Sequence, residues 1–337
     1  MIVSDGSTRT EEEIRSSWRD MHVKPLWEIK MGPGATPPQR VGQWKWSAME
    51  PLIMEALKLT SPDIVERRVL SLIDPSGAEG DFQTTTNLNA ALQILRPGEA
   101  ARAHRHPMNA LRFVLSGNGA VTRVDGKTAL MMEGDLVTTP GWAWHEHWHE
   151  GNEPIVWLDV LDVHLHLHLG TFRPNDPGPP HDVPTYPPEE AFASANVVPD
   201  MTSGPHSPIF RYPAADAVAA LRHAPPSRDG SRRVRYVNPL TGGPIMSMLD
   251  SYLVELDAGM HTIPFRTSAN AICAIVSGRG ATQIDDLTLD WEPRDIFSLP
   301  HDMTIRHHAE EPSRMFVTTD REVYRRLGLL TEIFGAS

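Results

Sequence analysis

The chain has 337 residues, which is enough for two domains of ordinary size. Its formal net charge is −12, and no basic stripe appears, so nucleic acid is not an expected partner. No apolar run reaches the ~18 residues of a membrane span, and the polar, acidic first residues do not resemble a secretory signal. We therefore expect a cytoplasmic protein without a membrane partner. The one cysteine, Cys273, excludes an internal disulfide and a cysteine-based zinc site.

Residues 1–79 are predicted to form an N-terminal helical arm. The first helix is expected over 9–22, because acidic residues gather near its start. A second helix is expected over 47–58, with Ser47 as its cap, and a third over 62–71.

From about residue 80 the pattern changes to short apolar segments separated by turn signals, as in an antiparallel sandwich or barrel. We expect a first barrel over 80–170 and a second over 236–320. A proline-rich linker over 171–235, with a short helix at 214–223, separates them. A helix over 321–337 closes the chain.

The second β block repeats the first. The segment RPGEAARAHRHPMNALRFVLSGNG aligns with DAGMHTIPFRTSANAICAIVSGRG, and MEGDLVTTPGWAWH aligns with EPRDIFSLPHDMTI. The alignment matches glycine, aspartate and proline positions in both copies: Gly98 with Gly259, Gly117 with Gly278, Asp135 with Asp295, and Pro140 with Pro300. Such an internal duplication indicates two copies of one barrel. The predicted fold class is therefore dominated by β structure.

Histidines in the first copy predict a metal site. His104 and His106 are two residues apart, so in a strand they point to the same face. His145 follows Pro140 and is expected on a neighbouring strand, where it completes one face of a coordination octahedron. Three neutral imidazoles suit iron, copper or zinc and leave open positions for a substrate.

The second copy does not keep these ligands. Phe265, Thr267 and Ile305 align with the three histidines, and they cannot form a comparable site. We expect a degenerate barrel with a structural role. His307 and His308 are interpreted as surface histidines.

The stretches HRHPMNALRFVLSGNG and GDLVTTPGWAWHEH carry the cupin signature and resemble the gentisate 1,2-dioxygenase group, which includes salicylate and 1-hydroxy-2-naphthoate dioxygenases. The resemblance covers residues 40–170 and 236–334. It implies two cupin (double-stranded β-helix) barrels, an Fe(II) cofactor, O2 as co-substrate and a homotetramer. The implied reaction is an extradiol-type ring cleavage of a small aromatic carboxylate, between its carboxyl-bearing and hydroxyl-bearing carbons.

An anionic substrate calls for arginine. Arg112 has the same strand parity as His106 and is expected to face inward, where its fork suits a carboxylate. It also matches the substrate-binding arginine of the group. Arg68 resembles a second substrate arginine and Gln93 is a further pocket candidate. Trp144 is expected in the barrel wall, where it is a candidate for substrate binding.

His147 shares the parity of His145 but is not expected to bind the metal. The resemblance implies that it forms a hydrogen bond with the substrate or with oxygen. Asp159 resembles an acid that orients such a histidine.

One position departs from the group. The strand before the histidine pair reads NLNAALQ, with Asn89 where the group generally has tryptophan. A smaller, polar residue leaves more room, which favours a 5-nitro- or 5-halo-salicylate over gentisate.

The segment VHLHLHLG places His164, His166 and His168 at alternating positions. We interpret it as a strand with one histidine face that meets solvent or an interface. A second metal site is disfavoured there, because three residues on one flat face do not surround an ion easily.

Two other functions remain open. A metal-dependent isomerase or hydrolase is possible on the same barrel, because one fold hosts many chemistries, and an isomerase would consume no oxygen. A non-enzymatic ligand-binding cupin predicts damaged ligands in both barrels, whereas here the first set is intact.

Overall fold

The computed structural model describes residues 10–21, 24–25, 39–77, 81–178, 180–194 and 196–335. Residues 1–38 and residues 39–337 form two separate units. The first unit contains α1 (Glu11–Asp20), which confirms the first predicted helix and begins with a capping box between Thr10 and Glu13. Within the described ranges, no helix has the length and apolar character needed to cross a membrane.

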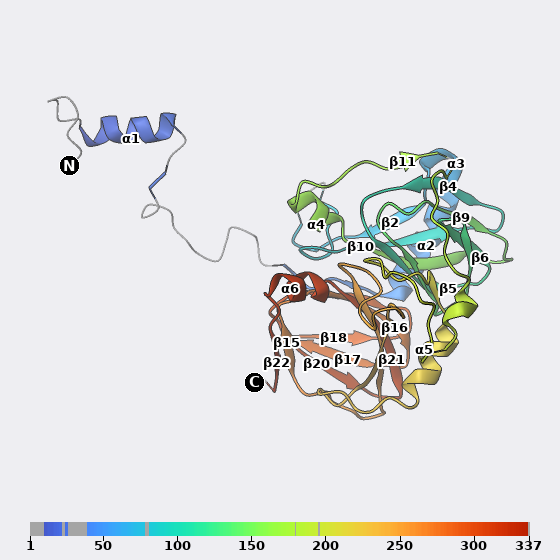
Figure 1. Cartoon of the computed structure of the whole chain (residues 1–337). Coiled ribbons are helices and arrows are strands. Elements are labelled where there is room, and N and C mark those ends of the chain that lie inside the picture. The colour runs from blue at the N-terminus through green and yellow to red at the C-terminus, as the bar shows by residue number, and fades with distance from the viewer. Residues whose placement is uncertain are drawn as a thin grey trace. The chain divides into compact units, whose positions relative to one another are not determined.

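The second unit contains two barrels (Figure 1), which confirms the predicted fold class. Each barrel in the described residues is built from a six-stranded and a five-stranded sheet. In the first barrel the six-stranded sheet has the order β12 (Arg211–Tyr212), β8 (Leu136–Thr139), β5 (Ala110–Ser116), β10 (Ile155–Leu161), β3 (Asn89–Leu95), β2 (Val69–Leu72). Its five-stranded sheet has the order β11 (Asp176–Pro177), β4 (Ala100–Arg105), β9 (His145–His149), β6 (Ala120–Val124), β7 (Lys127–Met131).

The second barrel repeats this plan. Its six-stranded sheet has the order β1 (Gln43–Trp44), β19 (Ile296–Leu299), β16 (Ala271–Ser277), β21 (Ser313–Thr319), β14 (Asp250–Leu256), β13 (Arg232–Arg235). Its five-stranded sheet has the order β18 (Leu287–Trp291), β17 (Gly280–Ile284), β20 (Thr304–Ala309), β15 (Phe265–Thr267), β22 (Glu332–Phe334). The duplication seen in the sequence is therefore present strand by strand.

Matched glycines end the matched strands β5 and β16. Gly117 has φ +91° and Gly278 has φ +85°, a left-handed conformation that other residues rarely adopt. A Cβ on Gly117 would lie 2.6 Å from the carbonyl oxygen of Pro154. The backbone conformation and the lack of space for a Cβ both require glycine at this turn.

Two predicted helices are confirmed and others are corrected. The structure contains α2 (Trp46–Leu59) and α5 (Ala214–Leu221) close to their predicted positions. The helix expected over 62–71 ends after α3 (Pro62–Val65), because residues 69–72 pair with β3 as strand β2. The closing helix, α6 (Arg321–Leu327), is also shorter than expected, and strand β22 follows it. A short 3-10 helix, η2 (Glu189–Phe192), lies in the linker.

Matched aspartates cap two of the helices. Ser47 is not the cap of α2, because Lys45 precedes the helix and the Asp295 carboxylate accepts the Trp46 backbone N–H at 2.7 Å. In the first barrel, Asp135 accepts the Ala214 backbone N–H at the start of α5 at 2.9 Å. A carboxylate at a helix start satisfies a free N–H and complements the helix dipole.

These caps reveal a crosswise arrangement. Strand β1 precedes the first barrel in sequence but pairs with the second, whereas β12 precedes the second barrel and pairs with the first. The starts of α2 and α5 are capped in the same crosswise manner, although α5 packs on β13 and β14 of the second barrel. Strand β2 of the same N-terminal arm pairs with the first barrel. Each barrel is therefore completed by a segment that belongs, in chain order, to the other.

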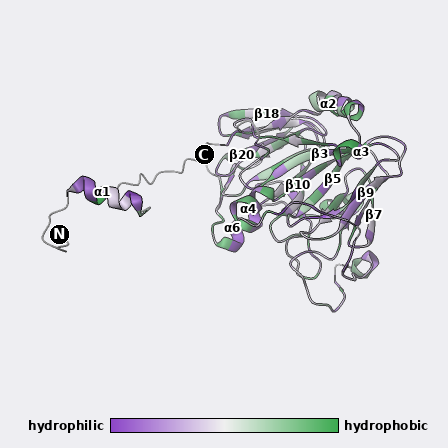
Figure 2. Cartoon of the chain, turned by 90° about the horizontal axis from the view of Figure 1, so that it is seen from above, coloured by the Kyte–Doolittle hydropathy of each residue, from purple (hydrophilic) through white to green (hydrophobic). Residues whose placement is uncertain are grey.

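The six-stranded sheets of the two barrels pack against each other through one continuous apolar core. The aromatic rings of Phe113 and Phe316 stack across it, with centroids 4.1 Å apart and planes 8° from parallel. In Figure 2, hydrophobic residues are seen along the strands labelled β3, β5 and β10. The core contains buried residues of both sheets, including Leu92, Ile94, Leu111, Leu158, Val160, Leu253, Ile272 and Ala274. Burial of apolar surface on this scale holds the barrels as one body.

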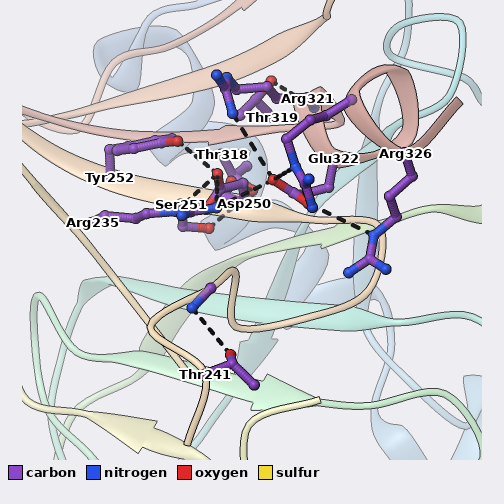
Figure 3. Close-up of polar contacts among 12 residues, drawn as sticks. Arg235, Thr241, Asp250, Ser251, Tyr252, Thr318, Thr319, Arg321, Glu322 and Arg326 are labelled. Atoms are coloured by element: carbon purple, nitrogen blue, oxygen red, sulfur yellow. Dashed lines mark hydrogen bonds and ion pairs between the residues drawn. The ribbon is translucent and has the colours of Figure 1, made fainter. Parts of the chain in front are cut away.

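A buried charge cluster fixes α6 to the second barrel. Arg235 lies between Asp250 and Glu322 (Figure 3), with its Nη2 2.8 Å from one carboxylate and 3.2 Å from the other. Both carboxylates are fully buried. The Glu322 carboxylate also pairs with Arg325 at 2.6 Å. Removing one partner of such a cluster would leave an uncompensated buried charge, so the cluster has a structural role.

Candidate metal centre and substrate pocket

The three predicted histidine ligands converge inside the first barrel. His104 and His145 are paired across strands β4 and β9, and His106 lies just beyond the end of β4. One ring nitrogen from each lies within 4.8 Å of the others, and all three side chains are buried. The ring centroids of His104 and His145 are 4.0 Å apart. The predicted cluster therefore forms without any chain segment having to move.

Backbone carbonyl groups fix the orientation of each ring. Nδ1 of His104, His106 and His145 lies 3.0 Å from the carbonyl oxygens of Arg102, Met108 and Ala143, respectively. Since a carbonyl oxygen only accepts, each Nδ1 must carry the proton and each Nε2 must keep its lone pair. This is the tautomer that binds a metal through Nε2.

The donor set fits a divalent metal ion. Nε2 of His104 and Nε2 of His145 are buried and have no hydrogen-bond partner among the described residues, which is costly unless a ligand satisfies them. Burial, followed by the positive charge of Arg67, lowers the pKa of His104 to about 3. Burial lowers the pKa of His106 to about 3 as well. Both rings are therefore neutral, as a metal ligand must be.

Arg112 faces the histidines, as its parity predicts. It is buried, its Nη1 donates to the hydroxyl of Thr139, and its Nε lies 3.3 Å from Asp159. Its Nε is buried and makes no hydrogen bond with any described residue. Burial lowers the pKa values of His145 and His147, and the positive charge of Arg112 lowers them further. The arrangement presents free N–H groups of a buried guanidinium beside the metal site.

Asp159 does not contact His147, so its expected role is corrected. Its carboxylate pairs with Arg112 and accepts the indole N–H of Trp157 at 3.2 Å. Burial raises the pKa of Asp159 to about 6, against the opposing charge of Arg112. Asp159 therefore balances the charge of the arginine at neutral pH.

Thr122 holds His147 in place. The Thr122 hydroxyl lies 2.8 Å from Nδ1 of His147 and donates to the sulfur of Met131 at 3.0 Å. The hydroxyl oxygen is then left to accept the Nδ1 proton, so Nε2 of His147 keeps a lone pair. That Nε2 is buried without a partner in the described part of the chain. His147 thus offers a hydrogen-bond acceptor next to the ligands. The sequence gives no direct sign of Thr122, because its role depends on the pairing of β6 with β9.

Gln93 and Asn89 both lie on the inner face of β3. The Gln93 side-chain nitrogen is buried and has no partner among the described residues, which leaves two N–H donors for a ligand. Asn89 is buried, but its side-chain nitrogen donates to the Phe82 carbonyl oxygen. That Asn89 leaves a larger pocket stays a prediction. Its side-chain nitrogen is already engaged in the hydrogen bond with Phe82.

Arg68 is committed elsewhere, which contradicts its expected contact with substrate. Its guanidinium pairs with both oxygens of Glu99 at 2.7 and 2.8 Å and also donates to the carbonyl oxygen of Thr60. The adjacent Arg67 is the one whose charge acts on His104, His106 and Arg112. Arg68 and Arg67 thus differ in their surroundings, because the arm turns between α3 and β2.

Two other expectations are corrected. Trp144 lies outside the barrel interior: its indole N–H donates to His181 and Arg105 stacks on its ring, so it does not line the pocket. The segment with alternating histidines is not a strand but helix α4 (Val163–His168). His164 is buried, whereas His166 contacts Asp162 and Thr171. Helical periodicity therefore spreads the three histidines, and they form no metal cluster in the described residues.

The second barrel lacks the ligands, as predicted. Phe265 pairs with Ile305 in the way that His104 pairs with His145. His307, however, is partly buried: it lines a cavity of the second barrel, and its Nδ1 lies 2.8 Å from the Thr282 hydroxyl.

Comparisons with known proteins agree with this site. A family model for the cupin domain matches residues 91–161. The chain is 32% identical over 336 residues to gentisate 1,2 dioxygenase 1 of Aquipseudomonas alcaligenes, and the match covers 96% of each chain. It is also 32% identical to a 5-aminosalicylate 1,2-dioxygenase of Comamonas sp, over 86% of this chain and 80% of that one. The crystal structure of a salicylate 1,2-dioxygenase from Pseudaminobacter salicylatoxidans superposes with a TM-score of 0.87 at 27% identity, covering 99% of this chain and 100% of that chain.

Replacing one ligand should empty the metal site. We predict that His106→Ala retains iron at least about tenfold more weakly than the wild type, because two imidazoles remain of three. His307→Ala is the matched control, since it alters a histidine in the second barrel. Iron per chain after loading and gel filtration is the measurement. Equal iron in the wild type and His106→Ala, or iron loss only in His307→Ala, would contradict the assignment.

Proposed function

This chain belongs to the gentisate and salicylate 1,2-dioxygenase family, and we propose that it cleaves the ring of a salicylate-type aromatic acid between the carboxyl-bearing and hydroxyl-bearing carbons. The proposed cofactor is Fe(II), and O2 is the co-substrate. We also propose a homotetramer that acts in the cytoplasm. The observation that carries the proposal is a three-histidine cluster beside a buried arginine that has free N–H groups.

The metal-binding residues would be His104, His106 and His145. A bound iron(II) ion would supply open coordination positions for the substrate and O2, and electrons for oxygen chemistry. The absence of a carboxylate from the cluster leaves the centre with its full positive charge, which favours an anionic substrate.

The other pocket residues bind and orient that substrate. Arg112 receives the carboxylate through its free N–H groups, while Asp159 balances the charge of the guanidinium. His147 accepts a hydrogen bond from the ring hydroxyl at its unprotonated Nε2 and can take up that proton. The side-chain nitrogen of Gln93 donates to a further substrate oxygen. Holding carboxylate and hydroxyl together fixes which ring bond faces the metal.

Asn89 supports a preference for a substituent on the ring. It stands on the inner face of β3, two residues from Ala91 and four from Gln93, in the position where the family generally carries tryptophan. The smaller side chain leaves space for a polar group at the 5-position, such as nitro, halogen or amino. The relative from Comamonas sp is named for 5-aminosalicylate, which agrees with this preference.

Oxygen uptake tests the reaction and the substrate class together. Anaerobically iron-loaded protein should consume O2 with salicylate or a 5-substituted salicylate, and the 5-substituted rings should be turned over faster than gentisate. Asn89→Trp should lower kcat/KM for the 5-substituted rings at least about tenfold, because the added bulk occupies the space for the substituent.

The same assay contains its own refutations. Turnover without O2 uptake would indicate the isomerase or hydrolase alternative. Gentisate turned over far faster than every substituted salicylate would end the proposed preference. No turnover of any aromatic acid by iron-loaded protein would end the proposed function.

Arg112 is tested by a charge-conserving change. Arg112→Lys keeps the positive charge near Asp159 but loses the planar fork. We expect kcat/KM to fall roughly 10- to 100-fold with iron content unchanged, since a hydrogen bond to a charged group contributes about 1.5–3 kcal/mol. Arg123→Lys is the control, because Arg123 pairs with Glu146 on the outer face. An Arg112→Lys variant as active as the control would show that Arg112 does not bind substrate.

A further inference from the structure

The degenerate barrel retains a cavity of about 120 Å³ that is partly open to solvent. The cavity lies where the metal pocket lies in the first barrel, because Phe265, Thr267 and Ile305, the counterparts of the three ligands, line it. Strand pairing also places Cys273 opposite Val317, as Arg112 stands opposite Asp159 in the first barrel. The second pocket has therefore lost its metal ligands and its charged pair, but it has not been filled. Most of its wall is apolar, formed by Val254, Ala269, Ala271, Leu299 and Met315 together with the residues named above. Arg321 and Glu332, which pair with each other, also line it.

One histidine of the first pocket is kept. His307 occupies the position of His147, and Thr282 holds it as Thr122 holds His147. The residue on the other side of the threonine hydroxyl differs between the two barrels. Trp291 donates its indole N–H to the Thr282 hydroxyl at 3.0 Å, where the first barrel has a methionine sulfur that accepts.

A tryptophan donor in place of the methionine acceptor reverses the direction of the hydrogen bond between the threonine and the histidine. Because the indole N–H can only donate, the Thr282 hydroxyl is free to donate its own proton to Nδ1 of His307. The ring proton of His307 is then on Nε2. Burial, with Arg233 adding and Asp229 opposing, lowers the pKa of His307 to about 4, so the ring is neutral. Nε2 makes no hydrogen bond in the described residues, and the histidine presents one N–H to the cavity.

Arg233 provides a second donor. It lines the same cavity from strand β13, and its Nε is buried and has no partner within the described ranges. Its Nη2 pairs with Asp229, whose other oxygen accepts from the backbone N–H and the hydroxyl of Ser231. Asp229 is thus already satisfied, whereas the Nε–H of Arg233 still lacks an acceptor.

We propose that this cavity binds a single-ring aromatic carboxylate, independently of the metal centre. Two N–H donors without acceptors call for a ligand with oxygen acceptors, and the apolar wall calls for a hydrophobic body. The cavity of about 120 Å³ is somewhat smaller than an apolar cavity of about 150 Å³ that holds benzene, so it takes at most one ring. A fused two-ring acid is too large.

Calorimetric titration with benzoate tests the proposal. The full-length chain with His106→Ala and Arg112→Lys is used, so that neither a bound metal nor the Arg112 fork contributes benzoate binding in the first barrel. We expect one benzoate bound per chain and no binding of 1-naphthoate. His307→Ala added to this chain should weaken binding at least about tenfold, which is what the loss of one charged hydrogen bond predicts. Cys273→Phe should abolish binding by filling the cavity, because Cys273 lines it and is fully buried.

Two controls keep the test decisive. Cys273→Ala leaves the cavity open and should bind as the parent does, and His261→Ala alters an exposed histidine of the same barrel and should also have no effect. Should Cys273→Phe fail to fold, His307→Ala decides the matter. Absence of benzoate binding, or binding that survives in His307→Ala, would overturn the proposal. The oxygen-uptake assay of the first barrel is unaffected by either result.

Discussion

The carbonyl groups that hold the Nδ1 protons of His104, His106 and His145 determine what this protein can do. Each carbonyl belongs to a residue two positions away in sequence, so the ring orientation is set by the local chain path. Burial keeps the rings neutral, and the lone pairs on Nε2 are directed toward one another. The site is thus organised before a metal arrives, and the cost of orienting the ligands is met during folding.

The crosswise pairing of β1 and β12 gives the second barrel a structural role. Each barrel pairs with a strand that belongs, in sequence, to the other half, and Asp295 and Asp135 cap the helices that follow those strands. The apolar core between the two six-stranded sheets adds to this mutual dependence. The interior residues of the second barrel could therefore change from charged and metal-binding to apolar ones, as long as its outer strand pairing and helix contacts were kept.

The parts of the fold and site that depend on short-range alternation were predictable from the sequence. Strand parity places His104, His106 and Arg112 on the inner face, and the duplication predicts that Phe265 and Ile305 replace ligands. The predictions failed where contacts beyond the local sequence pattern determine the structure. Glu99 takes Arg68 away from the pocket, and the histidines of α4 alternate in sequence but lie on a helix. Thr122 was missed because only the pairing of β6 with β9 brings it to His147.

X-ray absorption at the iron edge tests the central claim most directly. It is recorded on anaerobically loaded wild-type protein before and after salicylate is added. The three converging imidazoles predict about three histidine nitrogens at the iron in both states, with a change only in the remaining oxygen ligands when salicylate binds. Fewer imidazoles, or a spectrum that salicylate does not alter, would contradict an iron centre that binds the aromatic acid directly.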